Sequence, residues 1–161
     1  MTKDLHLVGF RIGRETFGVP INLVHEIVRV PDITSVPDAP DFIEGVINLR
    51  GKIISIVDLR KRFGEQQIIA NKKNSIVVGE VVSRMVGLIV DAASEVLKLT
   101  AEEIEPPPST FEEGELNYVT GVGKLRDRLI ILIELNKILQ RGELRRVGDA
   151  AAAAESFGAS A

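Results

Sequence analysis

Residues 42–63 read FIEGVINLRGKIISIVDLRKRF, and this stretch decides the fold because a second copy of it lies further along the chain. The second copy, residues 118–139, reads YVTGVGKLRDRLIILIELNKIL. Both copies hold two apolar runs on either side of a short turn that begins with an arginine, Arg50 or Arg126. Apolar runs separated by such a turn are typical of a β-hairpin. The sequence therefore predicts the same hairpin twice.

The repeat extends beyond the hairpin. Residues 7–30 match residues 76–99 without a gap, and over both matches 10 of 46 paired positions are identical. About 3 or 4 identities would be expected by chance from an apolar-rich composition. Each half contributes roughly five strands, which is enough to close a small barrel.

We therefore expect an all-β fold of two five-stranded barrels that are related by the repeat. The predicted barrels span approximately residues 15–65 and 75–140, with exchanged terminal segments. Helix is expected only in short pieces, after Asp58 and after Glu134, and the Asp58 carboxylate is placed to cap the first of them.

The composition excludes several classes of protein. The 161-residue chain has a net charge of −3 with both signs interleaved, so it shows no basic surface for nucleic acid. It has no Cys, which excludes disulfides and thiolate metal sites. Aromatic residues make up 4% and Trp is absent, so Val, Ile and Leu must build the core. No apolar run is long enough to span a bilayer, and we expect no insertion into a membrane.

Candidate catalytic residues are few. His6 and His25 are the two histidines, and neither belongs to a pair with metal-ligand spacing. Glu26 and Glu95 are carboxylates at equivalent positions of the repeat. Solvation or a hydrogen bond to the backbone is a simpler interpretation of them than paired acid–base chemistry. Residues 121–124 are glycine-rich but lie within a strand pattern, so they form no phosphate loop. The sequence predicts no enzymatic activity, no metal and no cofactor.

The Arg50-Gly51 turn is the most distinctive polar feature. Gly51 supplies the positive φ that a tight hairpin turn requires. Arg50 has no such structural reason, and either a solvated side chain or a contact residue fits the sequence. The second turn reads Arg126-Asp127, so we expect Asp127 to pair with Arg126, whereas Arg50 lacks a local partner and is free to bind another molecule.

The stretch quoted first resembles the signature of the CheW family of chemotaxis coupling proteins. ETFGVPINLVHEIVRV (residues 15–30) and MVGLIVDAASEVLKLTAEEIEPPP (residues 85–108) are also similar to family segments. The resemblance covers the chain from about Leu5 to Gln140. It implies two intertwined SH3-like barrels in a domain of residues 1–146. Residues 147–161 are Ala-rich without a periodic apolar face, and we expect them to form a disordered tail.

The resemblance also implies a function. A member of this family is a non-catalytic adaptor between the regulatory domain of the histidine kinase CheA and the cytoplasmic tips of methyl-accepting chemoreceptors. It is a monomer in isolation and part of a larger array, cytoplasmic and peripheral to the inner membrane. The predicted receptor contacts lie in a groove where the barrels meet: Val24, Glu26, Gly45, Arg50, Gly51 and Val96.

The kinase-facing surface is predicted from an exposed strand edge at Thr16–Ile21. Its candidate contacts are Phe17, Val19 and Ile21. Phe111, a lone aromatic residue in a polar loop, is a further candidate, although it could equally fold back on its own barrel. Val24 and Val96 could likewise be ordinary core residues. The alternative function is a small-ligand sensor that uses the groove between the barrels as its pocket.

Overall fold

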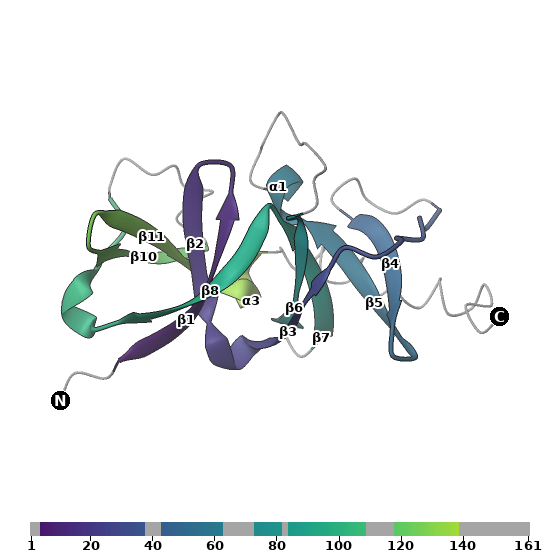
Figure 1. Ribbon diagram of the computed structural model, residues 1–161, viewed down its shortest axis with the longest axis horizontal. Helices are drawn as coiled ribbons and strands as arrows, with labels where there is room; N and C mark the ends of the chain where they lie inside the picture. The colour runs from purple at the N-terminus through teal and green to yellow at the C-terminus, as the bar shows by residue number, and fades with distance from the viewer. Residues whose placement is uncertain (1–3, 38–42, 63–72, 82–83, 109–117, 139–161) are drawn as a thin grey trace.

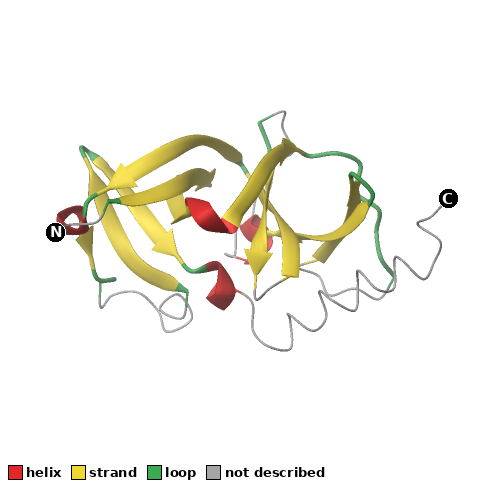
Figure 2. Ribbon diagram, turned by 90° about the horizontal axis from the view of Figure 1, so that it is seen from below, coloured by secondary structure: helices red, strands yellow, loops and turns green. Residues whose placement is uncertain are grey.

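The computed structural model describes residues 4–37, 43–62, 73–81, 84–108 and 118–138. The strands are β1 (Leu5–Ile12), β2 (Glu15–Pro20), β3 (Val24–Arg29), β4 (Ile43–Leu49), β5 (Lys52–Asp58), β6 (Ser75–Val81), β7 (Arg84–Val90), β8 (Ala92–Leu99), β9 (Ile104–Glu105), β10 (Val119–Leu125) and β11 (Arg128–Ile133). The helical pieces are η1 (Ile21–Leu23), α1 (Leu59–Arg62), η2 (Ala101–Glu103) and α3 (Leu135–Ile138). They are short, and most lie at the junction between the barrels (Figure 2). The expected helices after Asp58 and Glu134 are confirmed as α1 and α3.

The strands form two sheets, which curl into two barrels that lie side by side (Figure 1). We call the sheet with the order β8-β1-β2-β11-β10-β9 barrel A, and the sheet with the order β3-β6-β7-β5-β4 barrel B. The repeat relates β1 to β6, β2 to β7, β8 to β3, β10 to β4 and β11 to β5. Under this relation the two sheets have the same strand order. The predicted all-β fold of two repeat-related barrels is therefore confirmed.

Each barrel takes one hairpin from the other half of the chain. The β1–β2 hairpin joins strands of the second half through a parallel pairing of β2 with β11. The β6–β7 hairpin joins strands of the first half through a parallel pairing of β7 with β5. The barrels are thus intertwined as expected, but the exchanged segments are whole hairpins, so the predicted ranges 15–65 and 75–140 describe neither barrel. A repeat cannot show which copy of a hairpin a strand pairs with, because both copies offer the same pattern.

In each barrel, a short segment that precedes a hairpin in sequence pairs with the first strand of that hairpin and helps to close the barrel. In barrel B, Thr34 exchanges two backbone hydrogen bonds with Val46 of β4, each 2.9 Å long. In barrel A, β9 pairs with β10 in the corresponding place. A β-bulge precedes both pairings, next to Gly45 in β4 and Gly121 in β10. Gly45 has a φ of +148°, and a Cβ atom there would overlap the carbonyl oxygen of Thr34. Glycine is therefore required at position 45.

The apolar core has three parts, one inside each barrel and one between them. The interior of barrel A is built around Leu7, Leu99 and Ile130, and that of barrel B around Ile56 and Ile76. We call the third part the junction cluster; it contains Val8, Phe10, Ile12, Phe17, Val19, Ile43, Val57, Leu59, Val77, Val81, Val86, Leu88, Val90, Val119, Ile133, Leu135 and Ile138. The rings of Phe10 and Phe17 stack in it with centroids 5.9 Å apart. The space between the barrels is therefore packed with side chains from both.

A buried polar network lies beside the junction cluster, around the guanidinium of Arg60 in α1. The Nε and Nη2 atoms of Arg60 each donate a 3.0 Å hydrogen bond to the Asp58 carboxylate, and Nη1 donates to Asn74 at 3.2 Å. The Asp58 carboxylate also accepts the backbone N–H of Arg60 at 2.9 Å, which confirms the predicted cap of α1. Burial lowers the pKa of Arg60, but the hydrogen bonds and charges of Asp58 and Asp91 outweigh it and the net shift is upward.

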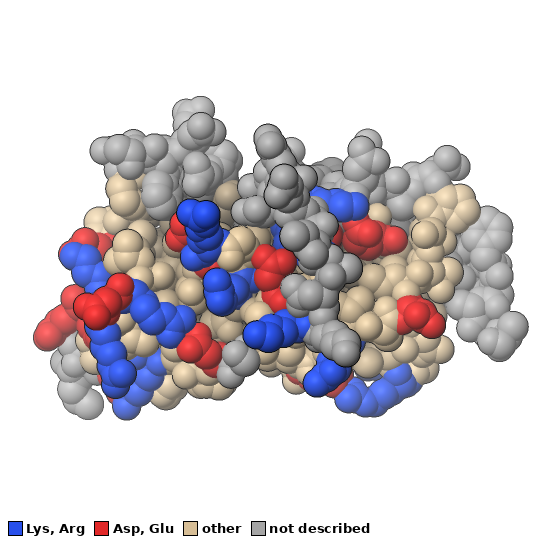
Figure 3. All heavy atoms as spheres, turned by 45° about the horizontal axis from the view of Figure 1, so that its top comes forward, with Lys and Arg blue, Asp and Glu red and all other residues tan. Residues whose placement is uncertain are grey.

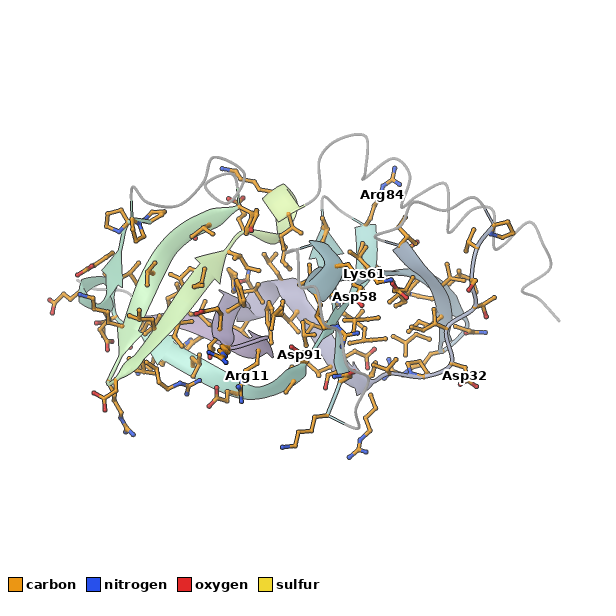
Figure 4. All side chains as sticks on the ribbon, turned by 90° about the horizontal axis from the view of Figure 1, so that it is seen from above. Arg11, Asp32, Asp58, Lys61, Arg84 and Asp91 are labelled. Carbon is orange, nitrogen blue, oxygen red and sulfur yellow. The ribbon has the colours of Figure 1, made fainter. Side chains whose placement is uncertain are left out.

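Asp91 connects this network to the other barrel. One of its carboxylate oxygens lies 3.4 Å from Nη1 of Arg60, and the other accepts a 2.7 Å hydrogen bond from the backbone N–H of Gly13. Gly13 belongs to the β1–β2 turn of barrel A, whereas Asp58 and Arg60 belong to barrel B. Figure 4 shows Asp58 and Asp91 near each other where the barrels meet. The network therefore links one barrel to the other through hydrogen bonds that are at least partly buried.

Candidate functional site

Glu26 and Arg50 form a bidentate ion pair at the surface of barrel B. Nη1 and Nη2 of Arg50 donate to the two carboxylate oxygens of Glu26, at 2.6 and 2.5 Å. Glu26 lies on β3 and Arg50 in the turn after β4, and these are the two edge strands of the barrel B sheet. Arg50 has no local partner, as expected, but the expectation that its side chain is therefore free is wrong. The partner lies 24 residues away in sequence and comes close only because the barrel closes.

The backbone of Arg50 also has an unusual conformation. Its φ is 52° and that of Gly51 is 85°, as in a type I′ hairpin turn. The side-chain oxygen of Asn48 accepts the backbone N–H of Gly51 at 2.8 Å and supports the turn. Arg126, at the equivalent position, has a φ of 57°. Both hairpins thus hold an arginine in the left-handed region, which non-glycine residues seldom occupy.

The second copy carries an ion pair of the same kind but uses a different arginine. Nη1 and Nη2 of Arg128 donate to the carboxylate of Glu95, at 3.0 and 2.8 Å. Glu95 is the repeat equivalent of Glu26, so each of these glutamates binds an arginine rather than a backbone group. The expected Arg126–Asp127 pair is not found, since Arg126 forms no ion pair within the described part of the chain. In the two arginine–glutamate pairs, the glutamates occupy equivalent positions of the repeat but the arginines do not.

Both glutamates titrate below their ordinary range. The side-chain hydrogen bonds from Arg50 lower the pKa of Glu26, and those from Arg128 lower the pKa of Glu95. The same bonds raise the pKa of Arg50 and of Arg128. Because each glutamate has a lower pKa in the folded protein, its contribution to stability is present above the unfolded pKa. It is lost as the pH falls through the folded pKa.

We expect Arg50→Ala to raise the pKa of Glu26 toward its ordinary value, because the hydrogen bonds that stabilise the carboxylate are removed. Glu95 provides an internal control, since Arg128 continues to hold it and its pKa should stay low. An NMR titration of the side-chain carboxyl carbons measures both groups in one sample. An unchanged pKa of Glu26 in Arg50→Ala would show that the pair does not form in solution.

The other predicted receptor contacts differ in how accessible they are. Val96 on β8 is 67% exposed. Gly51 lies at the tip of its turn, where an added Cβ atom would contact no other residue. Val24 is half-buried against the junction cluster. Gly45 is buried beneath Thr34, so it shapes the strand and offers no surface to a partner. β6 pairs with β3, which carries Val24 and Glu26, and also contacts β8, which carries Val96, so β6 lies between the two strands.

The prediction that Thr16–Ile21 forms a free strand edge facing the kinase is wrong. β2 lies between β1 and β11 in the barrel A sheet, so Thr16–Ile21 offers no free strand edge. Phe17 and Val19 are buried in the junction cluster because the exchange of hairpins turns their side chains toward barrel B. Ile21, in η1, is 41% exposed and stays a candidate. Phe111 and the tail of residues 147–161 lie outside the described residues.

The structure offers little support for a ligand pocket or a membrane segment. The junction cluster fills the space that a small-ligand sensor would need. In the described ranges, no three His, Asp or Glu side chains are grouped as metal ligands. No helix in the same ranges has both the length and the apolar character that crossing a bilayer requires.

Comparison with known proteins gives consistent matches. Residues 6–143 match the family model described as the CheW-like domain. The chemotaxis protein CheW of Klebsiella aerogenes is 39% identical over 142 residues, which cover 88% of this chain and 86% of that protein. CheW of Rhizobium meliloti is 37% identical, with 85% and 88% covered. The crystal structure of the scaffolding protein TtCheW from Thermoanaerobacter tengcongensis superposes with a TM-score of 0.79 at 39% identity, covering 88% of this chain and 96% of that one.

Proposed function

This chain belongs to the CheW-like domain family, and from that membership we propose that it couples the cytoplasmic tips of chemoreceptors to the histidine kinase CheA. It is a non-catalytic scaffold protein of chemotaxis. The proposal places it in the cytoplasm, peripheral to the inner membrane through receptor arrays. The small-ligand sensor is not favoured, because the space between the barrels is packed.

The exposed pair of Arg50 and Glu26 is the observation that carries the receptor contact. The Arg50 side chain is 72% exposed although it is paired. A guanidinium has five N–H donors, and Glu26 accepts from only two of the terminal nitrogens, so further donors face solvent. Glu26 therefore fixes the direction of the Arg50 side chain and leaves part of it available to an acceptor on a partner.

Apolar contacts in addition to this polar one suit a helical partner. Helices bind to protein surfaces through an apolar stripe with polar flanks. Val96 supplies an exposed apolar side chain on β8, and the half-buried Val24 lies on β3, the strand that carries Glu26. We propose that the helical hairpin tip of a chemoreceptor binds here, with Val96 and Val24 as apolar contacts and Arg50 as the polar one.

For the proposed kinase contact, fewer of the candidate residues are exposed. Of the three predicted strand contacts Phe17, Val19 and Ile21, only Ile21 is exposed. Phe111 stays a prediction. Ile21→Asp and Phe111→Asp, each tested for capture of a CheA regulatory domain, separate the two candidates. Retention of full capture by both variants would contradict this part of the proposal.

We expect Arg50→Glu to weaken binding of a chemoreceptor tip fragment by about tenfold or more, because one charge-assisted contact is lost and a repulsive charge replaces it. Isothermal titration calorimetry against the fragment measures the affinity. Folding should be retained, since both side chains of the pair are at the surface. Arg126→Glu is the matched control because it makes the same change at the repeat-equivalent turn of barrel A. Wild-type affinity in a folded Arg50→Glu protein, or equal losses in the two variants, would refute the assignment.

A further inference from the structure

The end of barrel A carries a shallow depression that the proposed receptor contact does not use. The depression has a volume of about 440 Å³ and is lined by Arg11, Arg14, Glu15, Thr16, Arg128 and Leu129. Figure 3 shows basic and acidic side chains interspersed over barrel A, in the left half of that view. Three arginines and one glutamate line the depression, which lies on the barrel that does not carry Arg50.

Strand register explains why these residues meet. Arg11 of β1 pairs with Thr16 of β2, and Thr16 pairs with Ile130 of β11. Paired residues project from the same face of a sheet, and the Ile130 side chain faces the interior of barrel A. Arg11 and Thr16 thus continue the interior row to the open end of the barrel. Arg128 lies two residues before Ile130 and therefore projects from the same face.

The arginines of this depression differ in how they are paired. Arg128 is held by Glu95 and also lies 3.5 Å from the Thr16 hydroxyl. Neither Arg11 nor Arg14 forms an ion pair or side-chain hydrogen bond with any residue that the structure describes. Among the described residues, Glu15 lines the depression and Glu95 holds Arg128, so three guanidinium groups stand beside two carboxylates. The described part of this site therefore carries a positive charge, although the whole chain has a net charge of −3.

An exposed apolar side chain lies in the same place. Leu129 lines the depression and is 58% exposed, which makes it one of the most exposed large apolar residues among those described. None of the described residues that line the depression is aromatic, so they provide no stacking surface of the kind with which proteins bind single-stranded nucleic acid. Arg11 and Arg14 form no ion pair with the described residues, although Arg11 interacts electrostatically with Glu95. Two such guanidinium groups next to a leucine instead match carboxylates that flank an apolar side chain.

We propose that this end of barrel A is a docking surface for an extended acidic segment of a partner protein, with an apolar side chain between its carboxylates. Arg11 and Arg14 bind the carboxylates through charge-assisted hydrogen bonds. Leu129 contacts the apolar side chain, and Arg128, oriented by Glu95, forms one wall. The surface is separate from the Arg50 site, so a scaffold with both can hold two partners at once.

The test uses the intact ¹⁵N-labelled protein and a blocked synthetic hexapeptide, Glu-Leu-Glu-Glu-Leu-Glu. Saturable shifts are expected at the amide signals of residues 13–16 and 128–130. Arg11→Glu/Arg14→Glu should raise the dissociation constant about tenfold or more. Leu129→Ser, which leaves every charge in place, should also weaken binding. Arg29→Glu/Lys52→Glu makes the same change in net charge on barrel B and should bind as wild type does.

Several results would overturn the proposal. These are the absence of saturable shifts at these amides, an equal loss of affinity in the barrel B control, and wild-type binding by both the double-arginine and the Leu129→Ser variants. Equal or tighter binding of an oligothymidine of the same charge would assign the surface to nucleic acid instead. No receptor or kinase is present in this experiment, so its outcome is independent of the receptor contact at Arg50.

Discussion

Residues 1–72 and residues 73–161, produced as separate polypeptides, are expected to be unfolded alone and to fold when they are mixed. The reason is the exchange of hairpins. Barrel B without β6 and β7 loses two interior strands of its sheet, and barrel A without β1 and β2 loses the corresponding pair. The junction cluster also takes residues from both halves, so neither fragment can bury its apolar strands.

Far-UV circular dichroism and thermal denaturation of each fragment, and of the equimolar mixture, test this expectation. The control is the full-length chain with a protease site between residues 72 and 73, cleaved after folding. The cleaved protein should stay assembled and melt in one transition. A cooperative melting transition in either isolated fragment would show that the half-chains are independent domains.

Arg60→Ala is expected to lower the free energy of unfolding by about 3–5 kcal/mol, because it leaves the buried Asp58 carboxylate without its partner. The side chains of Arg60 and Asp58 are 8% and 3% exposed, so water cannot replace the lost hydrogen bonds. The substitution also removes one of the two hydrogen-bond partners of the Asp91 carboxylate, whose other partner is the backbone N–H of Gly13 in the β1–β2 turn. For a chain of this size, such a change corresponds to a decrease of about 10 °C in the melting temperature.

Urea denaturation followed by circular dichroism measures the effect. Lys124→Ala is the control, because the ion pair of Lys124 with Glu105 has both side chains exposed to solvent. It should change stability by no more than about 1 kcal/mol. Equal stability of Arg60→Ala and Lys124→Ala would show that the buried network contributes nothing to holding the barrels together.

The sequence was sufficient to predict the local structure. Apolar runs flanking Arg50-Gly51 and Arg126-Asp127 predicted two hairpins, and both are found with the expected two-residue turns. Asp58 was expected to cap α1 and does so. These predictions succeeded because a turn or a cap depends on residues within a few positions of one another. The repeat carried the rest, since it showed that the same set of strands occurs twice.

The long-range contacts could not be predicted in the same way. Arg50 pairs with Glu26 across the two edges of a closed barrel, and no local pattern indicates which distant carboxylate will lie there. Phe17 and Val19 have an alternating pattern that fits a strand with one exposed face, but the exchanged hairpin buries them against barrel B. Arg60 resembles a surface residue of a short helix by sequence, and only the meeting of α1 with Asn74 and Asp91 makes it a buried one.

The exchange of hairpins has a consequence for the origin of this fold. If the link between the two halves is removed, each half donates a hairpin to the other and receives the equivalent hairpin in return. This is the arrangement of a domain-swapped homodimer with a twofold axis between the barrels. A single-copy ancestor would thus have formed the same pair of barrels from two identical chains. With both copies in one chain, folding is independent of protein concentration, and each barrel can carry its own surface residues, such as the different arginines Arg50 and Arg128.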